Sequence, residues 1–384
     1  MKFTPLSFQG PLAAGGVALM PFVLLQFTVP HEKALITLSD IEFTGLGIFN
    51  TFYFISLFGI MLLFTIIHLI LTVNSLIGLV KWLSKEREFI NFINTPLSNI
   101  GIFSPIVSLT MSMNVILGPA YFFITKISAN LQIIMWPALI SFAILSLIFF
   151  ILEIKIFKIW LNQAIDLDKL NFGWLLDAFA LGMLSLVGTG IASLSNTIEI
   201  ASTAAFIALF TLSFGFILFI SKLLYLIYHQ LRSITLPTKQ AQPTFFVVIP
   251  ISCLFGVSLY KFYVYLEKYF FFNIKFLSYF VITFSFVIAI GWGIFCLHLL
   301  SDYFKNEFVK NEFYPGQWTI VCALVGSEVL ASYVYGNFYA NLLFIIFNYI
   351  SILLASIIFI LILTRYYQAN YRDKINPVTV KTFA

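Results

Sequence analysis

Ten long apolar stretches recur along the chain, and they constrain its fold more than any other feature. A helix that crosses the hydrocarbon core of a bilayer needs about 20 mostly apolar residues. Because lipid offers the backbone no hydrogen-bond partners, each such stretch is expected to be helical. The stretches that qualify are residues 11–30, 48–72, 102–124, 131–154, 174–195, 200–228, 245–266, 276–300, 317–337 and 340–364. The sequence therefore predicts an all-α integral membrane protein whose single transmembrane domain covers residues 1–384.

Composition supports this class. Charged residues make up 10% of the chain and hydrophobic residues 61%, whereas soluble domains carry about 25% charged residues. The net charge of +5 does not predict a nucleic-acid partner, because the basic residues are concentrated in particular loops. Cys253, Cys296 and Cys322 lie far apart in apolar stretches, so they predict neither a disulfide framework nor a zinc site.

The first stretch has to be distinguished from a secretory signal. Only Lys2 precedes it, and no small-x-small cleavage site comes before the polar break at His31–Lys33. We interpret residues 11–30 as the first span.

Lysine and arginine residues are unequally divided between the two sides that ten spans would separate. With both ends on one side, the opposite side holds five of these residues: Lys33, Lys126, Lys261, Lys268 and Lys275. The side of the termini holds sixteen: Lys2, Lys81, Lys85, Arg87, Lys155, Lys158, Lys169, Lys222, Arg232, Lys239, Lys305, Lys310, Arg365, Arg372, Lys374 and Lys381. Positively charged segments stay in the cytoplasm. We therefore expect a multi-pass protein of the inner or plasma membrane with both termini cytoplasmic.

The connections predict five helical hairpins in series. Asn196–Glu199 and Asn337–Tyr339 are little more than turns, and short connections join antiparallel neighbours. The first helix of each hairpin is rich in small residues and helix breakers, whereas the second is bulkier. Small residues allow close helix packing, so they have two interpretations: five first helices surround a central pore, or the small residues serve packing alone.

The seventh stretch follows a polar, proline-punctuated segment within Leu236–Lys261. Pro250 lies inside its apolar part and is followed by Ser252, Cys253 and Gly256. Proline removes a backbone hydrogen bond and kinks a helix, and in lipid the freed carbonyl needs another partner. The pattern predicts a kinked helix that faces a crowded, partly hydrated interior, or a tolerated proline in an ordinary packed helix.

Signatures of enzymes are missing from the sequence. The GxG pieces at Gly188–Gly190 and Gly291–Gly293 lie inside apolar stretches, without a preceding strand or a third glycine. His31, His68, His229 and His298 have no metal-ligand spacing, and no Walker sequence occurs. We expect no enzymatic activity, metal or cofactor, and we expect His68 and His298 to be hydrogen-bonded packing residues rather than metal ligands.

Two acidic residues fall inside apolar stretches, where ionisable groups are costly and often functional. Glu328 lies near the middle of the ninth stretch and is either a proton-titrating or gating carboxylate or a paired group that locks helices together. Asp177 lies near the start of the fifth and is interpreted as a helix cap. Lys222 and Arg365 are expected to extend to the interface.

No ring of basic residues lies at the middle of the membrane. Selectivity for an anion would then depend on hydroxyls, amide dipoles, helix ends and backbone carbonyls. The candidates for this pathway are Ser108, Ser112, Asn114, Thr189, Ser193, Pro250, Ser252 and Ser258.

Several segments together resemble the family of bacterial tellurite-resistance TehA proteins, plant slow-type anion channels, and fungal malate and sulfite transporters. The similarity covers nearly the whole chain. It rests on FQGPLAAGGVALMPF at 8–22, Thr95-Pro96 followed by Pro105, YHQLRSITLP at 228–237 with the segment after it, and QWTIVCALVGSEVLAS at 317–332.

The resemblance implies ten helices in five tandem hairpins, with the odd-numbered helices lining a central pore in each subunit of a homotrimer. It also implies passive flux of small anions such as chloride or nitrate, or proton-coupled transport of dicarboxylates or sulfite. Family members commonly close the pore with a phenylalanine on the ninth helix. Here that place falls on or near Cys322. The gate candidates are therefore Cys322, Phe22, Phe103 and Phe255.

Three functions follow as hypotheses. The first is a passive anion channel, and the second is a proton-coupled carrier of dicarboxylate, sulfite or tellurite-like anions that uses Glu328. The third is a membrane scaffold or regulator without transport.

Overall fold

The fold is helical throughout the part of the chain that the computed structural model describes, residues 3–43, 47–163, 165–233 and 235–375. Ten helices in these residues are long and apolar enough to cross a membrane, and none of these residues forms a β-strand. The predicted all-α membrane class is therefore confirmed. Among the basic residues that predict the orientation, Lys2 and Lys381 lie outside the described residues.

Short 3-10 helices precede five of the membrane-length helices and extend them. These are η1 (Pro5–Phe8), η3 (Ser98–Phe103), η6 (Phe172–Leu175), η7 (Gln242–Val247) and η9 (Pro315–Gln317). The long helices are α1 (Gln9–Thr28), α2 (Ile48–Leu83), α4 (Ser104–Val115), α7 (Leu131–Asn162), α8 (Leu176–Leu194), α9 (Ile198–Arg232), α10 (Val248–Phe270), α11 (Lys275–Leu299), α12 (Trp318–Asn337) and α13 (Leu342–Ile375).

The membrane-length helices fall into two groups by burial. In the spans that contain α1, α4, α8, α10 and α12, between 61% and 94% of the most apolar window is buried. In α2, α7, α9, α11 and α13 that share is between 22% and 39%. The alternation follows the sequence, because the first group holds the small residues and the second the large apolar side chains that remain exposed.

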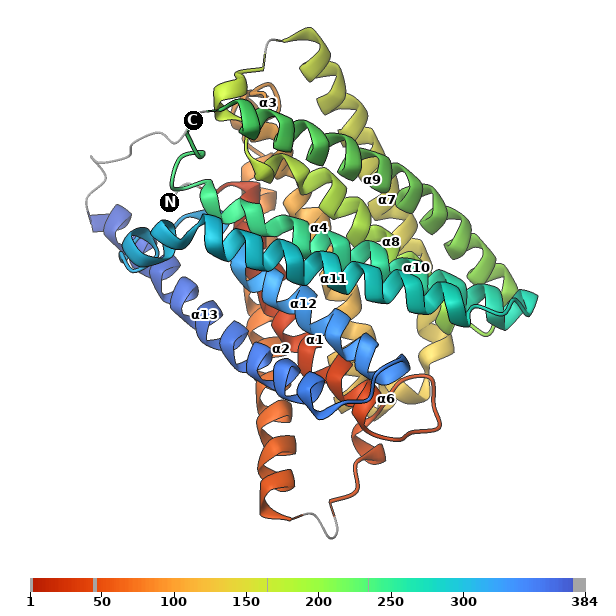
Figure 1. Cartoon of the computed structure of the whole chain (residues 1–384). Helices are drawn as coiled ribbons and strands as arrows, with labels where there is room; N and C mark the ends of the chain where they lie inside the picture. The colour runs from red at the N-terminus through yellow and green to blue at the C-terminus, as the bar shows by residue number, and fades with distance from the viewer. Residues whose placement is uncertain (1–2, 44–46, 164, 234, 376–384) are drawn as a thin grey trace.

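The five buried helices form a closed ring in chain order. α1 contacts α4, α4 contacts α8, α8 contacts α10, α10 contacts α12, and α12 returns to α1. The exposed helices pack outside this ring: α2 on α1, α9 on α8, α11 on α10 and α13 on α12, while α7 contacts α8 and α9. α9 and α13 lie on opposite flanks of the bundle in Figure 1.

Helix boundaries differ from the predicted spans chiefly at the ends rich in lysine and arginine. The helix predicted for 48–72 continues to Leu83, and α3 (Glu86–Ile93) lies in the connection between the second and third predicted spans. Phe89 and Phe92 of α3 pack on Trp82 with ring centroids 5.5 and 5.4 Å apart. Hydropathy detects only the apolar part of a helix, whereas lysine, arginine and glutamate continue it readily.

Pro119 and Pro250 coincide with changes of helix type, whereas Pro21 lies inside α1 without one. Pro119 lies in a five-residue π-helix, η4 (Ile116–Ala120), between α4 and the short α5 (Tyr121–Phe123). Pro250 is in the first turn of α10, where η7 passes into α-helix. A proline in the first α-helical turn removes an N–H that needs no intrahelical partner, so Pro250 marks a helix start rather than a break in the middle of α10.

Glycines of α8 serve both of the purposes that the sequence left open. A Cβ atom at Gly188 would lie 2.5 Å from the ring of Phe142 and 2.8 Å from Ala208, so Gly188 is needed for contact with α7 and α9. A Cβ atom at Gly190 would meet nothing within 4 Å. One glycine thus permits packing, and the other leaves space open.

These surroundings predict that the same substitution lowers stability at Gly188 much more than at Gly190. Gly188→Val should destabilise the fold by about 1–3 kcal/mol because overpacking forces neighbours to move. Gly190→Val should leave stability nearly unchanged beyond the shared cost of a β-branched residue in a helix. Thermal unfolding of both variants in detergent measures the difference, and equal losses would contradict the described packing.

Candidate functional site

A cavity of about 420 Å³ occupies the interior of the ring, toward the C-terminal ends of the five central helices. Every central helix contributes to its wall. Representative lining residues are Gly16 and Phe22 of α1, Asn114 of α4, Gly190 and Ser193 of α8, Pro250 and Lys261 of α10, and Val325 and Tyr333 of α12. The exposed helices do not contribute to the wall among the described residues.

A second cavity of about 190 Å³ lies toward the opposite end of the same helices. Its wall is built from the N-terminal turns of the central helices and the segments that precede them. Representative lining residues are Leu6, Gln9, Ser98, Ser104, Lys169, Asn171, Thr244 and Thr319. Together, the larger and the smaller cavity occupy the axis of the ring from one end toward the other.

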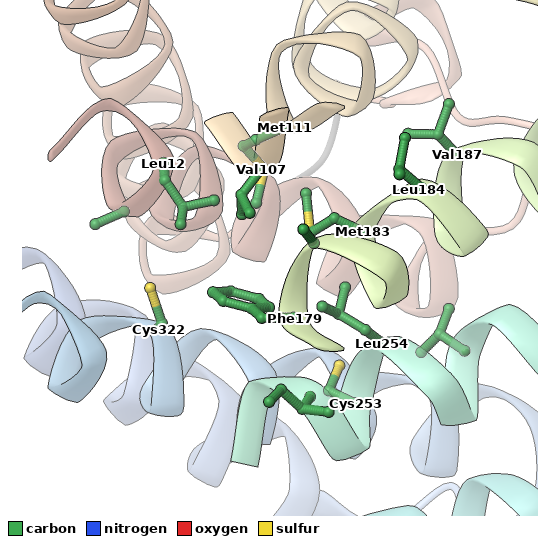
Figure 2. Close-up of a cluster of buried hydrophobic side chains, with 14 of the residues drawn as sticks. Leu12, Val107, Met111, Phe179, Met183, Leu184, Val187, Cys253, Leu254 and Cys322 are labelled. Carbon is green, nitrogen blue, oxygen red and sulfur yellow. The ribbon is translucent and has the colours of Figure 1, made fainter. Parts of the chain in front are cut away.

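Leu12 of α1, Phe179 of α8 and Cys322 of α12 line both cavities. All three side chains are largely buried, with exposed fractions of 3%, 5% and 9%. In Figure 2 the ring of Phe179 lies between Cys322 and Met183, in a cluster of apolar side chains. We call these three residues the constriction. It is apolar, and it separates the two cavities.

The charged residues that line the cavities are basic. Lys261 lines the larger cavity, and among the described residues it forms no hydrogen bond or ion pair. Lys169 lines the smaller one and pairs with Asp166, with Nζ 3.3 Å from Oδ2. No aspartate or glutamate belongs to either lining in the described part of the chain. An ion inside the ring would therefore meet the unpaired charge of Lys261 in the larger cavity and, in the smaller one, a lysine whose charge is offset by Asp166.

The residues predicted for an anion pathway divide into two groups. Asn114, Ser193 and Pro250 line the larger cavity. The others lie outside both linings: Ser108, Ser112, Thr189, Ser252 and Ser258. The hydroxyls of Thr189 and Ser252 donate to the carbonyls of Ser185 and Val248, at 2.8 and 2.9 Å. Such bonds to the preceding turn are common for Ser and Thr in helices.

Ser112 instead joins helices through His68. The His68 ring contacts the carbonyl oxygen of Pro11 at 2.7 Å and the Ser112 hydroxyl at 2.9 Å, so one buried side chain connects α1, α2 and α4. His68 is therefore a hydrogen-bonded packing residue, as expected.

The gate candidates occupy different environments. Cys322 belongs to the constriction, and Phe22 lines the larger cavity near Gly118. Phe103 packs on Phe149, with ring centroids 4.7 Å apart. Phe255 packs on Phe216 and Phe219 of α9. Phe103 and Phe255 line neither cavity, because each points from a central helix toward an outer one.

Glu328 is buried on the side of α12 that faces α13, outside both linings. Its Oε1 accepts a hydrogen bond of 2.8 Å from Ser332, whose hydroxyl accepts one of 3.0 Å from the Asn348 amide of α13. The second carboxylate oxygen, Oε2, has no hydrogen-bond partner among the described residues. The hydrogen bonds through Ser332 connect α12 with α13, so they favour the hypothesis that Glu328 locks two helices together over a titrating role in the pathway.

Asp177 is buried and forms an ion pair with Lys222 of α9. Lys222 also donates to the carbonyl of Trp174 at 3.2 Å and lies over the rings of Trp160 and Trp174. Asp177 lies inside the first turn of α8, whose N-cap residue is Leu175 and which has no side-chain capping hydrogen bond, so the cap interpretation was wrong. Asp177 Oδ1 accepts from the backbone N–H of Ala178 at 2.6 Å.

Neither basic residue that was expected to extend to the interface does so. Lys222 is 6% exposed and Arg365 5%. Arg365 donates to the carbonyl of Phe308 at 2.7 Å, and its guanidinium lies over the Phe308 ring. Both expectations were wrong, because each side chain has a partner inside the protein. Lys222 pairs with the buried Asp177 carboxylate, and Arg365 bonds to Phe308 in the connection between α11 and α12.

Phe179 and Lys261 line the cavities, although neither was among the residues predicted for the pathway or the gate. Phe179 is an aromatic residue among the small residues Ala178, Ala180 and Gly182, and that contrast was the available signal. Lys261 was counted only as a basic residue on the side opposite the termini. Its position beside Tyr260 at the end of an apolar segment gave no indication of which way it faces.

The buried pair at the start of α8 predicts non-additive stability effects. Asp177→Leu alone should destabilise the fold by about 3–5 kcal/mol because it leaves the Lys222 charge buried without its closest partner. The double variant Asp177→Leu/Lys222→Leu should lose less than that single variant. Chemical unfolding of the single and double variants in detergent tests this, and a loss in the double equal to the sum of both singles would contradict the pairing.

Comparison with known proteins gives no identification, since no protein-family model, curated protein or solved structure matches the chain. Within the described residues, no cluster of three or more His, Cys, Asp or Glu side chains is placed to hold a metal ion. The chain is therefore a multi-pass membrane protein whose five-helix ring encloses two mostly apolar cavities, each with one lysine in its described wall.

Proposed function

We propose that the chain is a passive transmembrane anion channel for small anions such as chloride or nitrate. The observation that carries the proposal is the two-cavity axis inside the ring, whose described lining contains lysine and no acidic residue. Both termini are proposed to be cytoplasmic, so that the smaller cavity opens toward the cytoplasm. The family resemblance found in the sequence supports the same function.

Electrostatics favours an anion over a cation in such a cavity. A recess with low-dielectric walls and charges of one sign focuses the field and raises the local concentration of ions of opposite sign. Lys261 provides that charge in the larger cavity. The Asn114 amide donates one N–H to the Thr110 carbonyl at 3.3 Å and keeps a second N–H that can replace part of the hydration shell of an anion. The hydroxyls of Ser193 and Tyr260 on the same wall already donate to the Gly190 carbonyl and to Asn337 Oδ1, at 3.0 and 2.8 Å.

The chemistry of the wall also favours weak binding. Most lining residues are apolar: Leu19, Val23, Met183, Val187, Leu254, Val257, Val325 and Val329. Conduction requires that an ion enters and leaves easily. A wall with one unpaired lysine and few donors meets both requirements better than a site with several converging charges.

Passive flux is favoured over proton coupling by the position of Glu328. A coupling carboxylate has to exchange protons with the pathway, whereas Glu328 is held by Ser332 on the far side of α12. Glu328→Gln should therefore leave anion flux and its pH dependence nearly unchanged. Uptake in proteoliposomes with and without a pH gradient checks this, and loss of pH-driven uptake with retained exchange would support a carrier.

The proposal as a whole is tested by reconstitution in planar bilayers under chloride and nitrate gradients at two pH values. We expect a reversal potential that follows the anion gradient, with little effect of pH. Proton-dependent uptake of a carboxylate or sulfite without current would overturn the channel function. Absence of any flux in bilayers and liposomes would support a non-transporting protein instead.

Lys261 allows a sharper test of anion attraction. Lys261→Met keeps much of the side-chain volume and removes the charge, so it should lower anion conductance by about tenfold at low salt and by less at high salt. Lys126→Met is the matched control, because Lys126 is an exposed lysine that lines neither cavity. Equal effects of the two substitutions would contradict a local role of Lys261.

A further inference from the structure

We propose that the side chain of Phe179 is the gate of this pathway: its ring blocks the passage between the two cavities, and conduction requires the ring to move. This inference rests on the proposed function. It assigns the gate to the fifth membrane-length helix, α8, whereas the sequence had placed the aromatic candidates on other helices.

The geometry carries the assignment. Leu12, Phe179 and Cys322 line both cavities and come from three helices of the ring, α1, α8 and α12. Phe179 is the largest of the three side chains. Figure 2 shows its ring extending toward Cys322, so a large side chain of α8 faces a small one of α12. The passage is filled mainly by a single ring.

The constriction is a barrier to ions because of its chemistry as well as its size. An anion in the larger cavity would lie near Lys261 and the Asn114 amide, and one in the smaller cavity near Lys169. Between the cavities it would have to lose water next to a leucine side chain, a phenyl ring and a thiol, none of which replaces a hydration shell. Apolar constrictions of this kind close channels by excluding water.

The protein holds the base of this side chain and leaves room for its tip. Two residues before Phe179, Asp177 pairs with Lys222, and Trp174 accepts a hydrogen bond from the same lysine. The start of α8 is thereby attached to α9. The larger cavity, at about 420 Å³, lies directly beside the ring. Rotation of the side chain into that cavity opens the passage without movement of α8.

Removal of the ring is the first test. In planar bilayers with a chloride gradient, Phe179→Ala should raise conductance at least about tenfold over wild type, because the apolar barrier is lost. Phe22→Ala is the matched control: Phe22 also lines the larger cavity but lies outside the constriction, so its removal should change conductance less than about twofold. Equal increases in both variants would overturn the assignment.

A reciprocal exchange separates plugging from a general loosening of the fold. Because Cys322 faces Phe179 across the passage, Phe179→Ala/Cys322→Phe places one ring back into the constriction from α12. This double variant should return conductance to about the wild-type level. Persistent high conductance in the double variant would show that Phe179→Ala opens the protein by another route.

A thiol readout distinguishes failure of the gate from failure of the proposed function, since it requires no anion flux. Cys253 and Cys296 are first replaced by serine, which leaves Cys322 as the single cysteine. In sealed proteoliposomes, a charged, membrane-impermeant thiol reagent applied from each side in turn should modify Cys322 slowly in this background. With Phe179→Ala, modification from both sides should be at least about tenfold faster.

The combined outcomes are unambiguous. Faster modification without anion current would support the gate and overturn the anion-channel function. Current in wild type and in Phe179→Ala at the same level, with unchanged modification of Cys322, would support the channel and overturn the gate. Unchanged modification and no current in either protein would overturn both.

Discussion

Close contact between the five central helices is the constraint on which the rest of the structure depends. Where α10 meets α12, a Cβ atom at Gly326 would lie 3.0 Å from the Cα of Pro250, and where α1 meets α4, one at Gly15 would lie 2.6 Å from Met111. Helices in lipid associate through packing and hydrogen bonds rather than through a hydrophobic driving force between them. Small residues at these contacts therefore determine how tightly the ring can close.

The outer helices solve a different problem, which is to separate this ring from lipid. Their exposed faces carry large apolar side chains such as Phe49, Phe206 and Phe276. Their inner faces satisfy polar groups of the ring: His68 bonds to Pro11 and Ser112, and Lys222 pairs with Asp177. Polar interactions thus join the outer helices to the ring, whereas the cavity wall retains only a few polar groups.

The sequence was sufficient for the helical class and the number of spans, because bilayer thickness fixes the length of an apolar stretch. It was weaker for the site. Asn114 and Ser193 line the larger cavity, whereas Ser108 and Thr189 on the same two helices do not. Six positions separate Ser108 from Asn114 and rotate the side chain by about 120° to another face of the helix. Thr189 and Ser193 are four positions apart and share a face, but the Thr189 hydroxyl is bonded to the Ser185 carbonyl. A helix that is apolar on all sides gives no pattern that defines which face lines a cavity. Phe179 and Lys261 were missed for the same reason.

The two cavities also determine where a membrane voltage would act. In the proposed channel, hydrated cavities that reach inward from both ends would conduct, so the potential difference would fall mainly across the short apolar section between them. The work of moving one elementary charge through 100 mV is about 2.3 kcal/mol, and here it would be concentrated around Leu12, Phe179 and Cys322. The field across that layer would be several times stronger than across a uniform bilayer, although none of the three side chains is charged.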